Sequence, residues 1–389
     1  MKIFSINTAK RHNALSDNYY KSKDIIVCLK QNEYEMLDKH VIECAFEIVL
    51  FNAIDDLPEI LEEKNIICND DCIFSASEDF MYIAAKIRER FKLSGMKVDE
   101  TSYFRDKCKM KERALSFGVN VPRYFNYEKG TDFATIASKV GTPFVLKPKD
   151  AAGAFGVYVI RDINDFEIVQ RNTNLDIGYE YEEFIDGKLY HVDLLLKGGE
   201  VKFQAACEYS FPNLDFQFGK PCLSLILEEN SRLHAQLTQF AIYSVKSLGL
   251  VNGPSHVEIF VKDTGELVFL EAACRTPGAI MVPIYQAQYD LNMIEAAIDI
   301  ESGHDIEQYR KNEFFCMGGI FPAIKGRIEK INDVDLQSPH MLKVDCNVGD
   351  IYDGVSSVKN LSGSIIVKGE SFSDVQSDFE VLKKFNLVE

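Results

Sequence analysis

Short apolar runs alternate with polar, helix-like stretches along the first hundred residues. The stretch from Ser77 to Lys92 is expected to be a long helix, because Ser77 can cap it and Glu78 and Asp79 suit the positive end of its dipole. Alternating strands and helices predict a small open α/β domain here. The runs expected to be strands are Asp24–Cys28, Ile48–Phe51, Ile66–Cys68 and Cys72–Phe74.

A second pattern begins near Ser102, where helices and longer strands are separated by glycines. Amphipathic stretches predict helices over Phe104–Phe117 and Thr131–Val140, ended by Gly118 and Gly141. Further helices are expected over Ser231–Leu248, Met293–Ile300 and Ser373–Phe385. One strand is expected to begin at Glu180. Others are expected over Pro143–Pro148, Val157–Ile160, Tyr190–Leu196, Val257–Val261, Leu267–Glu271 and Gly363–Lys368.

Composition narrows the class of protein. The 389 residues carry a net charge of −17, so we expect no general binding of nucleic acid or of an anionic membrane. The ten cysteines are scattered without a C-x-x-C pair, which favours free thiols in a reducing compartment. The N-terminus has no sustained apolar core, and no apolar stretch is long enough to span a bilayer. We therefore expect a soluble cytoplasmic protein.

The segment from Pro143 to Val157 contains the first candidate site. Lys147 ends an apolar strand, and the loop that follows contains Gly153 and Gly156. Such a loop can bring backbone N–H groups close to a phosphate, beside a fixed positive charge. It is not a Walker A loop, because the lysine precedes the glycines. A hairpin with an incidental lysine explains this segment equally well.

The segment from Glu180 to Asp193 contains the second candidate site. Glu182 and Glu183 lie at a strand end, where carboxylates beside exposed backbone can take the exocyclic amine and a ring nitrogen of adenine. A solvated acidic turn is the commoner explanation of an isolated pair of glutamates. His191, inside this segment, is expected to be an ordinary packed histidine.

The third candidate site lies on two consecutive strands. His256 and Glu258 share one face of the first, and Glu271 ends the second, four residues before Arg275. If the strands form a hairpin, Glu258 and Glu271 are neighbours, and two hard carboxylates suit Mg²⁺ or Mn²⁺ held with phosphates. Arg275 would then meet charge developing on a transferred phosphoryl group. A surface hairpin with paired charges is the alternative, but it explains poorly why a glutamate follows an apolar run.

Taken in order, the three segments resemble the ATP-grasp superfamily, and more narrowly its carboxylate–amine ligases, the group that contains L-amino-acid ligases. The resemblance covers about residues 100–305 and implies an α/β (α+β) fold of ATP-grasp type. It implies an N-terminal α/β domain (1–100), a central lid domain (101–190), a C-terminal catalytic domain (191–310) and an α/β extension of the catalytic domain (311–389).

The resemblance assigns roles to individual residues. Lys107 and Lys147 match the two nucleotide-binding lysines, and Glu258 and Glu271 match the metal-binding carboxylates. Arg275 matches the arginine that binds the phosphoryl intermediate, with His256 beside it as a second candidate catalytic residue. The remaining candidate nucleotide-binding residues are Gly153, Gly156, Glu182, Glu183, Phe184, Ile185 and Asp193.

The chain departs from the family pattern at three places. Leu189 stands where many relatives have a ribose-binding glutamate, and Ala273 stands where the metal motif often has an asparagine. The phosphate loop has Ala154 and Phe155 where relatives often place a serine. How ribose is held, and whether one or two metal ions bind, are therefore open.

The resemblance implies a ligase that uses ATP and Mg²⁺, with Mn²⁺ as an alternative metal. A carboxylate becomes an acyl phosphate and an amine then displaces phosphate, giving an amide and ADP, with an amino acid as one substrate. The partners are small-molecule carboxylates and amines, or an amine on a carrier protein, and a homodimer is left open. The alternatives are a non-catalytic ATP-binding module and a carboxylase-type enzyme that activates bicarbonate.

Overall fold

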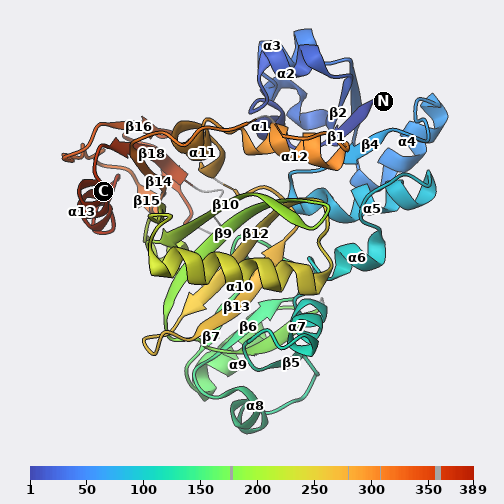
Figure 1. Ribbon diagram of the computed structural model, residues 1–389. Helices are drawn as coiled ribbons and strands as arrows, with labels where there is room; N and C mark the ends of the chain where they lie inside the picture. Colours follow the sequence, from blue (N-terminus) through green and yellow to red (C-terminus); the bar gives the residue numbers. More distant parts are fainter. Residues whose placement is uncertain (176–177, 279, 307, 355–360) are drawn as a thin grey trace.

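The computed structural model describes residues 1–175, 178–278, 280–306, 308–354 and 361–389 (Figure 1). Three sheets organise these residues: a parallel sheet near the N-terminus, a four-stranded antiparallel sheet in the middle and an eight-stranded antiparallel sheet. A short ribbon of β15 (Gly326–Arg327) and β17 (Ile351–Tyr352) accompanies them. None of the helices in these ranges is both long and apolar enough to cross a bilayer.

The N-terminal sheet has the strand order β3-β2-β1-β4, and all its pairs are parallel. Helices cover both faces, so the strands are continuous apolar runs rather than alternating ones, as parallel sheets require. The strands are β1 (Ile3–Ile6), β2 (Ile25–Lys30), β3 (Glu47–Phe51) and β4 (Cys72–Phe74). The helices are α1 (Ala9–His12), α2 (Asp17–Ser22), α3 (Lys39–Cys44), α4 (Leu57–Lys64), α5 (Met81–Arg90) and α6 (Val98–Ser102).

Two predictions for this unit are wrong in detail. The helix expected from Ser77 begins as a 3₁₀ turn (Glu78–Phe80) and becomes α-helical at Met81, and the Ser77 side chain makes no capping bond. Ile66–Cys68 forms no strand, because side chains take its backbone groups. Lys2 Nζ donates to Ile66 O (2.9 Å), and Cys68 N donates to Asp71 Oδ2 (2.8 Å).

The middle sheet has the order β5-β8-β6-β7, and α8 and α9 pack on one face of it around Phe144 and Tyr181. The opposite face is left for the site described below. Its strands are β5 (Tyr124–Asn126), β6 (Phe144–Pro148), β7 (Tyr158–Ile160) and β8 (Tyr179–Glu183), and its helices are α8 (Phe133–Val140) and α9 (Ile163–Asn172). We call this unit the lid sheet.

The large sheet has the order β13-β12-β9-β10-β11-β14-β18-β16, with α7 and α10 on one face and α11 and α12 on the other (Figure 1). The strands are β9 (Lys188–Lys197), β10 (Glu200–Tyr209), β11 (Cys222–Ile226), β12 (Gly253–Val261), β13 (Leu267–Ala273), β14 (Phe315–Pro322), β16 (His340–Val344) and β18 (Leu361–Gly369). The helices are α7 (Lys107–Ser116), α10 (Arg232–Leu248), α11 (Met281–Tyr289), α12 (Met293–Glu301) and α13 (Phe372–Leu382). The domain boundaries near 100, 190 and 310 stay predictions.

Helix α7 connects the large sheet to the lid sheet through buried charges. It starts at Lys107 rather than Phe104, because the Asp106 side chain accepts from the N–H groups of Cys108 and Lys109. Lys111 is fully buried, and its ammonium pairs with Glu180 (2.6 Å) and with Glu182. Glu182 also pairs with Lys147 at the end of β6 (2.6 Å).

These charges stabilise one another against the cost of burial. Burial alone would lower the pKa of Lys111, but Glu182 and Glu180 outweigh it and the pKa is raised. Burial alone would raise the pKa of Glu182, but Lys111 and Lys147 outweigh it and the pKa is lowered. Glu182 therefore contributes stability above the ordinary glutamate pKa, and that contribution is lost as the pH falls through its lowered value.

We expect Lys111→Met to destabilise the protein by about 3–5 kcal/mol, because it leaves a buried carboxylate without its partner. Lys109→Met on the exposed side of α7 is the matched control and should change little. Chemical denaturation at neutral pH measures both. A Lys111→Met protein as stable as the control would show that these charges do not hold the lid sheet to α7.

Candidate active site

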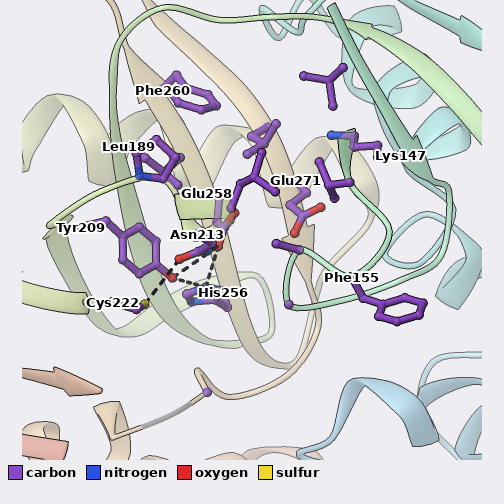
Figure 2. Close-up of a pocket in the computed structure, with 18 of the residues that line it drawn as sticks. Lys147, Phe155, Leu189, Tyr209, Asn213, Cys222, His256, Glu258, Phe260 and Glu271 are labelled. Atoms are coloured by element: carbon purple, nitrogen blue, oxygen red, sulfur yellow. Dashed lines mark hydrogen bonds and ion pairs between the residues drawn. The ribbon is translucent and has the colours of Figure 1, made fainter. Parts of the chain in front are cut away.

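A cavity of about 360 Å³ lies between the lid sheet and the large sheet. Figure 2 shows side chains from both sheets directed into it, among them Lys147, Glu258 and Glu271. Every site residue predicted from the sequence lines this cavity except Gly156 and Asp193. Its volume is in the range of pockets that bind small molecules and cofactors.

Two lysines reach one side of the cavity from different elements. Lys147 ends β6 as expected, and its ammonium lies 2.6 Å from Glu182 Oε1. Lys107 is the first residue of α7; its Nζ donates to Ala151 O (2.7 Å) and lies 3.2 Å from Glu271 Oε2. Both positive charges are held in place beside the loop after β6.

That loop has a backbone that only certain residues tolerate. Gly153, Ala154 and Gly156 have positive φ angles of 66°, 59° and 68°. A Cβ atom at Gly156 would lie 2.9 Å from the Tyr179 hydroxyl oxygen, so this glycine is required for close packing rather than for contact with the cavity. Gln217 Nε2 donates to Ala154 O (2.8 Å) and connects the loop to the 3₁₀ segment η5 (Asn213–Phe218).

The structure pairs the Glu182 and Glu183 carboxylates with cations, and their predicted contact with adenine stays a prediction. Glu182 is paired with Lys111 and Lys147, and Glu183 Oε2 lies 2.9 Å from Arg123 Nε. The segment Glu182–Ile185 also lines the cavity, next to an apolar slot. The side chains of this slot are Val145, Val159, Ile185, Leu189, Phe260 and Leu270. A flat apolar ring fits such a slot, with polar recognition left to backbone groups.

The pairing of β12 with β13 confirms the predicted hairpin, with Glu258 directly opposite Glu271. A bulge follows Glu258, so that Leu270 and Glu271 both line the cavity although neighbouring strand residues ordinarily face opposite sides. Glu258 accepts from Asn213 Nδ2 (2.8 Å) and from the Tyr209 hydroxyl (3.3 Å). Two neighbouring carboxylates are hard oxygen donors of the kind that Mg²⁺ prefers.

Charge around Glu271 keeps it ionised. Burial alone would raise its pKa, but Lys107 and Lys147 outweigh burial and lower it. Glu271 is therefore a carboxylate throughout the physiological pH range, as a metal ligand must be.

Arg275 follows β13 and lines the cavity, where Glu78 of the N-terminal unit meets it. Glu78 Oε2 lies 3.0 Å from Arg275 Nη2, and Glu78 Oε1 lies 2.6 Å from Arg105 Nη1. Burial would lower the pKa of Arg275, but Glu78 outweighs it. The sequence predicts for Glu78 only a place in the first turn of a helix, and it predicts no role for Arg105.

Asp193 does not reach the cavity, so its prediction as a nucleotide-binding residue is not supported. Its fully buried carboxylate accepts from His256 Nδ1 (2.7 Å), His191 Nδ1 (2.9 Å) and the Tyr285 hydroxyl. His256 does line the cavity, with Nε2 3.2 Å from the Tyr209 hydroxyl oxygen. Asp193 thus orients His256 from behind.

His191, Asp193 and His256 lie close enough together to hold a metal ion, but both imidazoles are already hydrogen-bonded to Asp193. Burial lowers the pKa of His256, but Asp193 outweighs burial and raises it to about 9. The pKa of His191 is also raised to about 9, because Cys207 and Asp193 outweigh burial. A metal ion would have to displace these protons. His191 is a packed, hydrogen-bonded histidine, as predicted.

Comparison with known proteins agrees with this geometry. Residues 140–283, which include the phosphate loop, the hinge, Glu258, Glu271 and Arg275, match the ATP-grasp domain family. The chain contains an ATP-grasp domain.

Several curated relatives of the chain are ligases. An L-arginine-specific L-amino acid ligase of Bacillus subtilis is 23% identical over 268 residues, which are 65% of this chain and 64% of that protein. An alanine–anticapsin ligase of Bacillus subtilis (strain 168) is 26% identical over 255 residues, which are 59% of this chain and 53% of that protein. The chain thus spans between half and two thirds of the length of these relatives.

The ATP-grasp fold extends over the described chain. A crystal structure of an L-amino acid ligase from Bacillus licheniformis superposes with a TM-score of 0.78 and 16% identity, and covers 98% of this chain and 97% of that one. At this identity the likeness shows the fold.

The sequence does not indicate that several other residues belong to this site. Lys111, Glu78 and Arg105 are charged residues of helical segments, where a solvated face is the ordinary expectation. Asn213 lies in a polar turn between strands and contacts Glu258 only because η5 folds back over the cavity. Their roles depend on contacts between elements far apart in the chain.

We expect Lys147→Ala to weaken ATP binding by about 10- to 100-fold, because a charge-assisted hydrogen bond to a phosphate is lost. Lys139→Ala, on the exposed side of α8, is the control. Calorimetric titration at a temperature where both variants are folded measures the affinities. Equal affinity in the two variants would remove Lys147 from the nucleotide site.

Proposed function

We propose that the protein is an ATP-dependent carboxylate–amine ligase that makes an amide bond through an acyl phosphate, with an amino acid as one substrate. One observation carries this proposal: a single cavity brings Glu258 and Glu271 together opposite Lys107 and Lys147, with Arg275 beside them. This set would combine ligands for a metal ion, cations for the phosphates, and a planar guanidinium that can donate to the oxygens of the transferred phosphoryl group.

ATP fits the polarity of the cavity. The apolar slot with Ile185, Leu189 and Phe260 suits the adenine ring, and the backbone of Glu183–Ile185 suits its polar edge. Lys107, Lys147 and the backbone of the loop with Gly153 would bind the phosphates. Glu258 and Glu271 would hold Mg²⁺ or Mn²⁺, which when bound neutralises phosphate charge and polarises the phosphorus–oxygen bond.

The chemistry follows in two steps. A carboxylate oxygen of the first substrate attacks the γ-phosphorus, the bond to the β-γ bridging oxygen breaks, and ADP leaves. The amine nitrogen then attacks the acyl carbon and expels phosphate, while a proton leaves the nitrogen. Free carboxylates do not react in this way near neutral pH, because phosphate is a far better leaving group than oxide.

Arg275 has the geometry to stabilise both steps. Its guanidinium can grip two oxygens at once, and Glu78 keeps it oriented from the side of the N-terminal unit. The lid sheet and η5 surround the site and would limit water, which otherwise hydrolyses an acyl phosphate.

An amino-acid substrate is supported by the names of the relatives and by the cavity wall. Ile280 and Met281 at the start of α11, together with Ile320 of β14, give part of the wall an apolar character that suits a side chain. The amine would be a free small molecule or one carried by a protein.

A screen of ADP release over amino acids, singly and in pairs, tests the proposal, with mass spectrometry of the products. A ligase releases ADP only with a suitable pair and yields an amide. A carboxylase releases ADP with bicarbonate instead. A binding module releases no substrate-dependent ADP with any pair, and that result would overturn the proposal.

We expect Glu271→Gln to abolish turnover at millimolar Mg²⁺ while the fold stays intact, because the neutral amide binds a hard cation much more weakly. Glu266→Gln, at the exposed end of the same hairpin, should keep wild-type turnover. Mg²⁺ dependence of ADP release measures both. Wild-type turnover by Glu271→Gln at low Mg²⁺ would place the metal elsewhere.

We expect Arg275→Lys to reduce kcat by about 10²–10³ with little change in ATP affinity, because its contacts matter most in the transition state. Arg232→Lys, exposed at the start of α10, is the control. Steady-state kinetics together with calorimetry separate the two effects. An equal loss of ATP affinity and of kcat/KM would make Arg275 a nucleotide-binding residue only.

A further inference from the structure

Three arginines cluster behind one wall of the cavity, and of these Arg275 lines it. Glu78 pairs with both Arg105 and Arg275. The third, Arg11, comes from α1 and reaches the loop after β13, where its Nη1 donates to Thr276 Oγ1 (3.2 Å). Glu78 therefore faces two positive charges, and Arg11 adds a third beside Arg275, in a chain whose net charge is −17.

Arg11 has no carboxylate within ion-pair distance among the residues that the structure describes. The charged group that acts on Arg11 most is Arg275, which has the same sign. Burial together with Arg275 lowers the pKa of Arg11 to about 9, which still leaves it protonated at neutral pH. A partly buried arginine beside another arginine, with a neutral hydroxyl as its partner, costs stability unless an anion joins it.

The phosphates of ATP are not the natural partner of this arginine. Lys107, Lys147 and a metal on Glu258 and Glu271 already face them, and Arg11 is not among the side chains that line the cavity. Arg11 lies next to Thr276, directly after Arg275, on the side of the N-terminal unit. A group that meets it must project past Arg275 toward α1.

We propose that Arg11 binds a substrate carboxylate that takes no part in the reaction. This inference rests on the proposed ligase function and deepens it, because it requires one substrate to carry a second, free carboxylate. Two sources supply that chemistry: the α-carboxylate of an amino acid that acts as the amine, or the second carboxylate of a dicarboxylic acyl substrate. In both, the guanidinium makes a charge-assisted hydrogen bond and sets specificity.

The test compares substrates that differ only in this carboxylate. For the amine, amino acids are compared with their C-terminal amides. For the acyl substrate, glutamate and aspartate are compared with glutamine and asparagine. Each pair is measured with wild type, Arg11→Ala, Arg11→Lys and the exposed neighbour Lys10→Ala as control, both by kcat/KM and by ligand-induced thermal stabilisation with Mg·ADP present.

We expect Arg11→Ala to lower kcat/KM about 10- to 100-fold for the carboxylate-bearing member of one pair and to leave its amide unchanged. Arg11→Lys should recover part of the loss, and Lys10→Ala should keep wild-type discrimination. The pair that responds identifies the source of the carboxylate. An equal loss for both members of each pair, or no loss for either, would overturn the inference.

Thermal stabilisation separates this inference from the ligase proposal. Carboxylate-dependent stabilisation that Arg11→Ala abolishes, without amide product from any pair, would support the subsite and contradict the ligase. Amide formation that is indifferent to Arg11 would support the ligase and contradict the subsite. A third outcome would also contradict the subsite: in the wild-type protein, each carboxylate-bearing compound gives no more thermal stabilisation than its amide.

Discussion

The buried cluster of Lys111, Lys147, Glu180 and Glu182 is the constraint on which the site depends. Four charged groups away from water are stable only when each faces opposite charge, so the lid sheet has to bring β6 and β8 to α7 in one register. Glu182 holds Lys147, the lysine that we propose binds a phosphate, in place. Lys111 and Lys107 are four residues apart on α7 and therefore lie on one side of the helix. A single helix thus presents one lysine to the lid sheet and another to Glu271.

The same principle explains how so acidic a chain can build the anion site that we propose. Its excess of carboxylates is spread over the surface, while the cations of the site are gathered by specific acidic partners: Glu182 for Lys147, Glu271 for Lys107 and Glu78 for Arg275. An incoming metal ion or anion then exchanges partners with groups that are already in place. Little has to reorganise when charge develops, and this is the condition for strong electrostatic stabilisation.

Local pattern predicted the elements that carry the chemistry, but not the contacts between them. The β12–β13 hairpin could be predicted because its strands are adjacent in the chain, and with it the neighbourhood of Glu258 and Glu271. The pairing of Glu182 with Lys111 could not be predicted, because the local sequence around a glutamate at a strand end does not indicate a contact with a lysine 71 residues earlier. The helix from Ser77 was placed within a few residues, yet the contact of Glu78 with Arg275 spans 197 residues. Asp193 belongs to the same sequence segment as the hinge, but its strand places it under His256.

The measurement that tests the account most directly follows oxygen from substrate to product. The carboxylate substrate identified by the ADP-release screen is labelled with oxygen-18 in its carboxylate, and released phosphate is analysed by mass spectrometry. An acyl phosphate requires that one labelled oxygen bridges carbon and phosphorus and leaves with the phosphate. The account predicts one labelled oxygen in each phosphate formed together with amide. Unlabelled phosphate accompanying amide formation would contradict it.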